Sequence, residues 1–594
     1  MDARRPLALK RQRAKILPRA KQFDFQAEVV LDTDPFHLVE PFTYGIPDQL
    51  RNEVAVGSKV RVPFRSSMVD GFVVAKTQRP GLSVKPILEV ANCAPIPPEL
   101  LTAASEISAR YATRLVDVLR LVVEMPLEIV TGSTPTSGAI QFNQVIGDAY
   151  LAALRLISRA GHSLLIAPSE RELDYLEALA RKHSDKTVIR IGAGGSQKKR
   201  RETLANLAKT ERALILGARS AIFLPVTLQE VVIIGELSSH YWDQRAPYWN
   251  LRDVAFIRAN ATNSKLTFVS SAPSLEMQRL IEMSYVKHIT QATGRSARRF
   301  SFEPNSFHET IRAGLERGCV LVSVADKAYS NFFLCDRCRS LPRCSCGGRI
   351  SMKDEHELIC ALCGDRPSEW RCLECGSNTR RLIRKGAARL GTELGKAFPN
   401  VPVRLSTASD PFSISNQDGI VVATPGAEPM NERFAALVLL DGNSLIARGG
   451  LRGEELLRNH WLRLLAMTKP DAKVYLSLLS NHPISQSLIT GKSERMVKNQ
   501  LQERIDLHLP PAKRIVTVSG PEREILALAK QLRLEDEGLH LSAVLKGPEG
   551  TAQINIRFDH NQARELANRL FTLQRYRAST RRELLAIKFD PLII

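Results

Sequence analysis

Eight of the ten cysteines in this chain fall in one segment, between Cys335 and Cys375. They form four short pairs, which read CDRC (335–338), CSC (344–346), CALC (360–363) and CLEC (372–375). In three of these pairs two residues separate the cysteines, a spacing that lets both thiolates reach one tetrahedral Zn²⁺ from a tight turn. Eight thiolates are enough for two closed four-sulfur sites, and a closed site is structural because no coordination position is left for water. The cysteine pattern therefore predicts two structural zinc ions.

The clustering favours metal ligands over disulfides. The first residues, MDARRPLALKRQRAKILPRAKQ, are basic but lack the apolar core of a secretory signal, so we expect a cytoplasmic protein with reduced cysteines. A four-cysteine iron–sulfur cluster and buried thiols without metal are the alternatives. The CSC pair departs from the pattern because one intervening residue gives a shorter bite, and His356 could in principle replace one of its thiolates.

The elements that would position the cysteines are strands and helices in alternation. Short, continuously apolar runs such as ALILGA (213–218) and EVVIIGE (230–236) alternate with helical segments, which favours a parallel α/β sheet. A second run of this kind begins at RGCVLVSVA (317–325), is interrupted by the cysteines and resumes at GTELGKAFPNVPVRL (391–405). The sequence thus predicts two α/β lobes, with the cysteine segment inserted into the second.

Shorter, alternating strands on both sides of the lobes predict a multidomain α/β protein. We divide the chain into a basic disordered arm (1–21), a β-rich N-terminal domain (22–100), a helical segment and linker (101–140), a first lobe (141–297), a second lobe (298–480) with a zinc-binding insertion (331–378), and a C-terminal α+β domain (481–594).

The charge of the chain points to an anionic partner. Its 83 Lys and Arg residues outnumber its 62 Asp and Glu residues, which gives a net charge of +21. Nucleic acid is the commonest partner of such a chain, although a basic protein with no polymer partner is an alternative. No run of about 18 uncharged apolar residues occurs, so we expect no membrane span.

Several motifs, in order along most of the chain, resemble the PriA family of bacterial replication restart proteins, also called primosomal protein N′. They are VGSKVRVPF (56–64), LGARSAIFLPV (216–226), VSSAPSLE (269–276), the cysteine pairs, LHLPPAKRIVTVSG (507–520) and the terminal IKFDPLII. Each motif is weak by itself, and their shared order carries the resemblance.

The resemblance implies RecA-like lobes, a DNA-binding N-terminal domain and a shortened winged-helix region at 101–140. It also implies how the zinc ligands pair. The outer Cys335, Cys338, Cys372 and Cys375 would bind one ion, and the inner Cys344, Cys346, Cys360 and Cys363 the other. The implied partners are forked and single-stranded DNA, other primosome proteins, single-stranded-DNA-binding protein, and the replicative helicase or its loader.

Proteins of the PriA family are normally ATP-driven DNA helicases. Three sequence elements that their ATPase needs are missing from this chain. A phosphate cradle needs G-x-x-x-x-G-K-[ST], but the corresponding segment IQFNQVIGDAYL (140–151) has one glycine followed by Asp148. The segment expected to read D-E-x-H is Gly235-Glu236-Leu237-Ser238, and the late arginine motif is reduced to Arg463. Gly491-Lys492-Ser493 has no partner glycine upstream, so we interpret it as a helix-breaking loop. This pattern resembles the actinobacterial branch of the family, whose members lack recognisable helicase motifs.

The N-terminal domain supplies the predicted DNA-binding residues. In the family an aromatic turn captures the 3′ end of a nascent strand, and the matching residues here are Phe42, Thr43 and Tyr44. The two aromatic rings could stack on a base or could be strand core. We assign phosphate contacts to Lys59, Arg61 and Arg65, for which a solvated strand face is the alternative.

The sequence therefore predicts a replication restart protein that binds stalled forks and helps reload the replicative helicase without hydrolysing ATP. An ATP-dependent 3′-to-5′ helicase with a non-standard nucleotide site is the main alternative. A zinc-containing nucleic-acid adaptor unconnected with replication is a further one.

Overall fold

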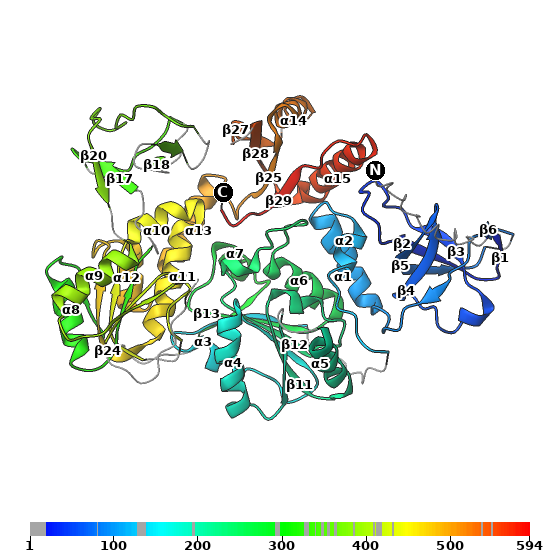
Figure 1. The fold of residues 1–594 in the computed structure, drawn as a ribbon, viewed down its shortest axis with the longest axis horizontal. Coiled ribbons are helices and arrows are strands. Elements are labelled where there is room, and N and C mark those ends of the chain that lie inside the picture. Colours follow the sequence, from blue (N-terminus) through cyan, green and yellow to red (C-terminus); the bar gives the residue numbers. More distant parts are fainter. Residues whose placement is uncertain are drawn as a thin grey trace, which may run out of the picture.

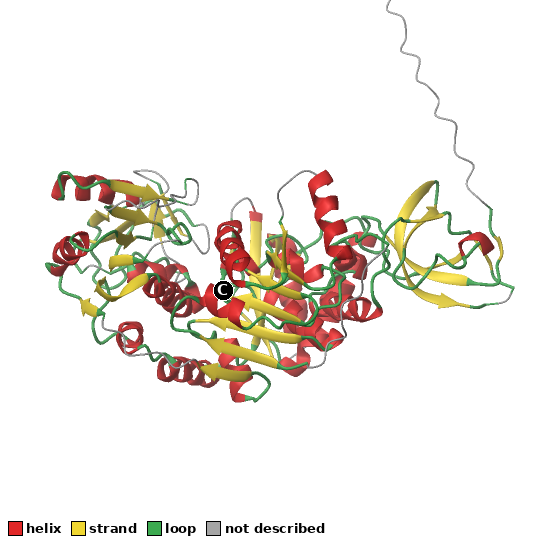
Figure 2. Cartoon of the chain, turned by 90° about the horizontal axis from the view of Figure 1, so that it is seen from below, coloured by secondary structure: helices red, strands yellow, loops and turns green. Residues whose placement is uncertain are grey.

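The computed structural model describes residues 19–79, 81–127, 138–192, 197–290, 298–325, 332–338, 340–345, 350–352, 357–360, 365–383, 386–407, 410, 419–430, 433–535, 538–547 and 550–593. The N-terminal sheet, the first lobe and the second lobe follow one another along the longest axis of the molecule (Figure 1). The C-terminal domain covers one side of the first lobe, and the cysteine insertion stands on the second. A view from below places the N-terminal sheet at the end opposite the second lobe (Figure 2).

The N-terminal domain is an antiparallel five-stranded sheet in the order β3-β2-β5-β4-β7. Its strands are β2 (Gln26–Leu31), β3 (Phe42–Gly45), β4 (Lys59–Phe64), β5 (Ser67–Thr77) and β7 (Glu89–Val90). Alternate side chains such as Val29, Val62 and Val73 are fully buried, as expected for strands with one face on a core. Lys21, which we assigned to the basic arm, pairs with β6 (Ser83–Val84) as part of the short β1 (Lys21–Gln22). Residues 1–18 of that arm lie outside the described residues.

Two helices connect this sheet to the first lobe. They are α1 (Pro98–Arg110) and α2 (Leu115–Leu119). Proline fits the first turn of α1 because the missing N–H would have no partner there. Within the predicted helical segment and linker (101–140), residues 128–137 lie outside the described residues.

The first lobe is a parallel seven-stranded sheet in the order β10-β11-β9-β12-β13-β8-β14. Its strands are β8 (Ile140–Gln144), β9 (Ser163–Ile166), β10 (Thr187–Ile191), β11 (Ala213–Gly217), β12 (Glu230–Ile234), β13 (Lys265–Ser270) and β14 (Lys287–Thr290). Its helices are α3 (Ala149–Arg155), α4 (Glu170–His183), α5 (Gln197–Lys209), α6 (Leu251–Thr262) and α7 (Leu275–Glu282). Every residue of β11 and β12 is buried, which is why their sequences are apolar apart from Glu230 at the start of β12.

The second lobe is a parallel six-stranded sheet in the order β15-β24-β23-β16-β22-β21. Its strands are β15 (Arg299–Ser301), β16 (Val320–Ser323), β21 (Val403–Ser406), β22 (Ile420–Ala423), β23 (Phe434–Leu439) and β24 (Thr468–Leu476). Its helices are α8 (Ser306–Leu315), α9 (Ala387–Ala397), α10 (Gly442–Arg448) and α11 (Gly453–Ala466). These two parallel sheets confirm the predicted pair of RecA-like lobes.

The structure moves the predicted end of the second lobe at residue 480. Helices α12 (Pro483–Thr490) and α13 (Glu494–Asp506), which we assigned to the C-terminal domain, bury Ile484, Leu488 and Met496 in the same apolar cluster as Trp461 of α11. They therefore belong to the lobe. The loop between them ends α12 at Gly491, whose φ of 68° suits glycine, so the Gly-Lys-Ser sequence is a helix break as predicted.

The cysteine insertion leaves the second lobe after β16 and returns to it before α9. Its described strands form two short antiparallel pairs, β17 (Phe332–Cys335) with β20 (Arg380–Ile383) and β18 (Ile350–Met352) with β19 (Leu358–Cys360). Phe333 and Trp370 pack edge to face, with ring centroids 5.0 Å apart. An apolar core this small suits a module that metal ligation completes.

The C-terminal domain is an antiparallel sheet with two helices, as predicted. Its strands are β25 (Arg514–Pro521), β26 (His540–Leu541), β27 (Leu545–Lys546), β28 (Thr551–Phe558) and β29 (Ala586–Phe589), and its helices are α14 (Glu522–Glu535) and α15 (Ala563–Ser579). One apolar cluster continues from α1 through the first lobe into β25 and α15. The C-terminal domain is thus built onto the first lobe.

Candidate metal centre, DNA-binding domain and interlobe cleft

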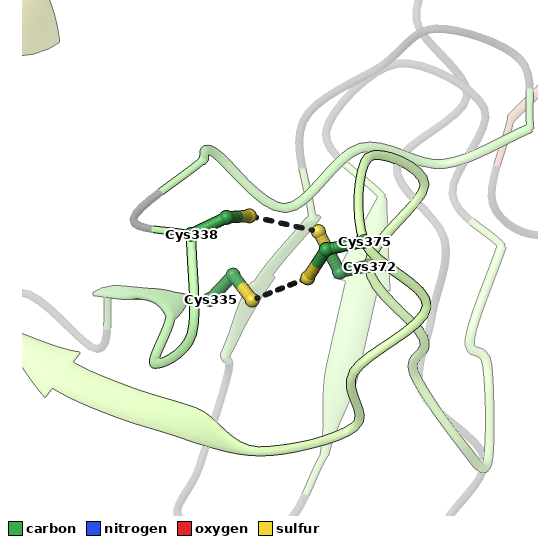
Figure 3. Close-up of side chains that lie close together, drawn as sticks. All are labelled: Cys335, Cys338, Cys372 and Cys375. Carbon is green, nitrogen blue, oxygen red and sulfur yellow. Dashed lines mark hydrogen bonds between the residues drawn. The ribbon is translucent and has the colours of Figure 1, made fainter.

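Two tight turns bring the outer four cysteines together. Cys335 ends β17 and Cys338 lies in the turn that follows, while Cys372 and Cys375 lie in the turn before β20. Their four sulfur atoms all lie within 4.8 Å of one another. Cys335 Sγ is 3.5 Å from Cys375 Sγ, and Cys338 Sγ is 3.5 Å from Cys372 Sγ (Figure 3). The ligand set that the resemblance implied for one ion is therefore assembled in space.

The donor set and its spacing fit a metal ion. Sulfurs bound tetrahedrally to zinc at about 2.3 Å stand about 3.8 Å apart, close to the distances within these two pairs. Cys335 and Cys372 are buried, so their thiols have little access to solvent. The cluster could hold a metal ion, and four thiolates are typical of a structural zinc.

The inner set of four is only half described. Cys344 and Cys360 are buried in the small core of the insertion, with Phe333 and Trp370. Cys346, Cys363 and the alternative ligand His356 lie outside the described residues. A second zinc ion therefore stays a prediction.

The structure places the predicted DNA-binding aromatics in different environments. Tyr44 is 4% exposed, and its hydroxyl donates to the Pro63 carbonyl at 3.3 Å, so its ring is part of the strand core. Phe42, on the edge strand β3, is half-buried and packs edge to face on Phe64 at 5.3 Å. The guanidinium of Arg65 lies 5.4 Å from the ring of Phe64. Phe64 lies on β4, which two strands separate from β3 in the sheet, so this contact requires the sheet to curl, a proximity that the sequence does not reveal.

The predicted phosphate contacts differ in how far they are already paired. Lys59 donates to Glu124 at 2.6 Å, and Arg61 donates to Asp70 at 3.0 Å. Arg65 is exposed at the turn between β4 and β5, beside Phe64. Of these three cations, Arg65 is the one best placed to meet a phosphate without first breaking an ion pair that the structure describes.

The cleft between the lobes is where the ATPase elements would face a nucleotide. Asp148 caps α3, and its Oδ1 accepts hydrogen bonds from the backbone N–H groups of Tyr150 and Leu151 at 3.0 and 3.1 Å. Its Oδ2 accepts from the hydroxyl of Tyr175 at 2.8 Å. In P-loop NTPases the backbone N–H groups of the loop and helix start that follow such a strand bind phosphate oxygens. Here these N–H groups donate instead to the carboxylate of Asp148.

The other two degenerate positions also carry structural contacts. Glu236 follows β12 and is buried, and its Oε1 accepts from the backbone N–H of Ser274 at 2.9 Å. Burial raises the pKa of Glu236, although Arg252 and the Ser274 hydrogen bonds oppose the rise. Arg463 donates to Glu428 Oε2 at 2.9 Å. The acid and the arginine that remain are therefore paired within the chain.

Little space remains in this cleft. A cavity of about 80 Å³ lies between the lobes, with Asp148, Tyr175, Met430, Arg433 and Arg463 in its lining. Sites for drug-sized ligands and cofactors usually measure about 300–1,000 Å³. The cavity is too small for a nucleoside triphosphate in this arrangement of the lobes.

A further polar junction links three parts of the chain near its C-terminal end. Asp590 accepts two hydrogen bonds from Arg514 at 3.0 and 2.6 Å, and its Oδ2 is 3.6 Å from Arg110 of α1. Arg110 also donates to Asp253 of α6 at 2.6 Å, and Arg110 and Arg252 help to hold the pKa of the buried Asp253 at about 2 against the effect of burial. The sequence pattern does not predict this junction. Its one signal was the Asp-Pro pair in the terminal motif.

The fold and the N-terminal domain define a class: a DNA-binding domain joined to two RecA-like lobes. The family model of the PriA 3′ DNA-binding domain matches residues 28–124. Solved helicase structures resemble the chain only loosely, such as yeast Dbp5 bound to RNA and ADP–BeF₃, with 11% identity, a TM-score of 0.34 and coverage of 68% of this chain and 98% of that one. At this level the match carries no functional information.

Curated relatives narrow this similarity further. The probable replication restart protein PriA of Mycobacterium tuberculosis is 29% identical over 597 residues, which cover 86% of this chain and 89% of the relative. The corresponding protein of Mycobacterium leprae is 26% identical over 94% of this chain and 99% of its own length. The replication restart protein PriA of Bacillus subtilis matches over 33% of this chain. The chain is thus a relative of the PriA replication restart proteins, which confirms the resemblance seen in its motifs.

Among the described helices, none combines the length and the apolar character needed to cross a membrane.

Proposed function

We propose that this chain is a cytoplasmic replication restart protein that binds DNA at stalled or abandoned forks and helps reload the replicative helicase, without hydrolysing ATP. Its similarity to PriA proteins along most of its length supports the restart role. The observation that carries the loss of ATPase activity is Asp148, whose carboxylate accepts the N–H groups that would otherwise bind phosphate.

In this proposal the N-terminal domain makes the first contact with DNA. Phe42 and Phe64 would stack on an unpaired base, and Arg65 would meet the adjacent phosphate. Lys59 and Arg61 would add longer-range attraction for the backbone. Tyr44 would support the strand from inside the core.

The cysteine insertion would present a protein-docking surface. One zinc bound by Cys335, Cys338, Cys372 and Cys375, and a second bound by Cys344, Cys346, Cys360 and Cys363, would fix its loops. Other primosome proteins, single-stranded-DNA-binding protein, and the replicative helicase or its loader are the partners that the family suggests.

Fork binding tests this proposal against a general nucleic-acid adaptor. The zinc-loaded full chain would be titrated, by fluorescence anisotropy at fixed salt, into a fork with a 3′ end at its branch and into a single strand of equal length. We expect at least about tenfold tighter binding to the fork, a difference of about 1.4 kcal/mol. Equal affinities for the two DNAs would remove the support for fork recognition.

The alternative function is an ATP-dependent 3′-to-5′ helicase with a non-standard nucleotide site. It requires the two lobes to separate and close again around a nucleotide at the interlobe cleft. Unwinding of the same fork that depends on added ATP would favour this alternative.

A further inference from the structure

We propose that the two lobes are locked into one rigid body by an intramolecular polar network, so that nucleotide neither enters the cleft nor changes the angle between the lobes. This inference deepens the proposed function and rests on it, because a chain that hydrolyses ATP would have to open this cleft. It adds a claim about nucleotide binding and motion, since a protein could lack ATPase activity and still bind nucleotide and move.

The centre of the lock is a buried acid of the first lobe held by arginines from both lobes. Glu276 of α7 pairs with Arg452, which ends the short helix before α11 in the second lobe. Glu276 is also 3.3 Å from Arg252 of α6, in its own lobe. Burial disfavours the charged carboxylate, but Arg452 and Arg252 outweigh this effect and keep the pKa of Glu276 well below its ordinary value. The acid therefore stays ionised and paired across the interface.

Direct hydrogen bonds to the backbone fix the same joint. Oε2 of Glu455, on α11, accepts from the backbone N–H of Leu275 at 2.9 Å, in the first turn of α7. Arg458, on the next turn of α11 and fully buried, donates to the carbonyl of Pro273 at 2.8 Å. The second lobe thus supplies partners to backbone groups at the start of a helix in the first lobe, groups that would otherwise lack them.

An apolar contact also packs the two lobes together at this interface. Leu275 forms a small buried cluster with Val497 and Leu501 of α13. Bonds to particular backbone atoms beside packed side chains define one relative position of the lobes.

A second joint lies at the cleft itself. Arg171 of α4 donates to the carbonyls of Gly426 at 3.1 Å and Glu428 at 2.8 Å, which belong to the loop after β22 in the second lobe. Met430, in the same loop, packs against the apolar core of the first lobe. Arg433 lies 3.8 Å from Asp148. The loop after β22 is therefore held against α4 and the apolar core of the first lobe, close to Asp148 at the start of α3.

A nucleotide has no means of opening these joints. A ligand shifts a conformational equilibrium only by the difference between its affinities for the two states. In an open cleft a nucleotide would meet two carboxylates, Asp148 and Glu428, beside two arginines, Arg433 and Arg463. It would not meet the lysine with which a phosphate cradle neutralises phosphates. Triphosphate binding would have to displace Asp148 from the α3 N–H groups and overcome its negative charge.

Distance measurements between the lobes test the lock. Spin labels attached through non-natural amino acids at the exposed positions Lys182 of α4 and Lys396 of α9 would report the interlobe distance in the zinc-loaded full chain, without using its cysteines. We expect one narrow distribution that is the same with and without Mg·ATP and forked DNA. A second population, or a shift on adding nucleotide, would overturn the lock.

A pair of matched variants tests which contacts hold the lobes. Glu276→Gln with Arg452→Gln removes both charges of the central pair. Glutamine matches the shape of Glu276 but is shorter than Arg452, so the variant also removes the guanidinium contact, and it should broaden the distance distribution. The control, Arg389→Gln with Glu393→Gln, removes an exposed pair within α9 and should leave the distribution unchanged. A narrow distribution in the first variant would contradict a lock centred on Glu276. The wild-type arm decides the main claim even if this variant fails to fold.

The same samples separate this inference from the proposed function. Phosphate release from ATP would contradict both. A nucleotide-dependent shift in distance without phosphate release would overturn the lock and leave the proposed function standing.

Discussion

Arg463 of α11 donates a hydrogen bond to the buried carboxylate of Glu428 at 2.9 Å. Arg463 is the arginine of the segment in which the sequence resemblance led us to expect a late arginine motif. An arginine that acts on a nucleotide has to be free to meet the developing charge on the phosphate. Here it neutralises an acid of its own lobe, in the loop after β22 that contacts the first lobe.

The histidine beside this pair should make stability depend on pH. His460 Nε2 lies 3.3 Å from Glu428 Oε1, and burial lowers the pKa of His460 to about 4, although Glu428 opposes the shift. The unfolded chain binds this proton near pH 6.5, whereas the folded chain resists it down to about pH 4. The contribution of neutral His460 is thus complete above pH 6.5 and is lost as the pH falls towards 4. The loss in the free energy of unfolding should reach about 3 kcal/mol.

Melting temperatures of the wild type and His460→Gln, measured across this pH range, check the prediction. The variant cannot take up the proton, so its melting temperature should fall less steeply between pH 6.5 and 4. Parallel curves for the two proteins would show that His460 does not carry the effect.

Removing Asp590 should loosen the C-terminal domain. Asp590→Ala leaves Arg514, whose side chain is 9% exposed, without its two charged hydrogen bonds, and should cost about 2 kcal/mol. Faster proteolytic release of the C-terminal domain is the expected readout. The control Asp471→Ala removes the exposed partner of Arg317, and exposed ion pairs contribute little. Equal release rates for the two variants would contradict a special role for Asp590.

The outer cysteine cluster should hold one zinc independently of the inner one. Cys335→Ser should lower the zinc content of the purified protein by one equivalent, measured by atomic emission, because three thiolates no longer close the site. Cys360→Ser should remove a second equivalent if the inner set also binds zinc. Cys93→Ser, far from the cluster in sequence, should change nothing. A wild type with one zinc would show that the prediction of two ions is wrong.

Arg65 should contribute to DNA binding through the phosphate backbone. Arg65→Ala should weaken fork and single-strand binding alike, and should lower the slope of log affinity against log salt by about 1. Arg389→Ala makes the same change in charge on the second lobe, where Arg389 is paired with Glu393. If the two variants lose affinity equally, Arg65 acts only through net charge.

The sequence alone predicts the lobes well because parallel strands are buried on both faces. The apolar runs that become β11 and β12 have every residue in the core, so no other element explains them. The predicted end of the second lobe at residue 480 differs from the structure because amphipathic helices, unlike buried strands, do not show in their sequence which neighbour covers them. The apolar faces of α12 and α13 are similar whichever neighbour covers them, and the sequence does not say that Trp461 lies beneath.

The candidate sites also differ in how far the sequence predicts them. The spacing of the cysteine pairs indicates metal ligation, and the structure brings the outer four cysteines together. Glu276 and Arg452 carry no such signal, because charged residues are common on surfaces and their burial depends on how the two lobes dock. For Tyr44 the sequence left base stacking and strand core open, and the structure buries its ring in the core, at the position of β3 that pairs with Ala27 of β2.

The central claim is that the chain works at forks without an ATPase. The direct test is phosphate release from ATP by the zinc-loaded full chain, with saturating forked DNA whose binding is confirmed in the same sample by anisotropy. We expect fork binding with no release above a protein-free control. Release that forked DNA stimulates would contradict the account and would show that a nucleotide reaches a working site despite Asp148.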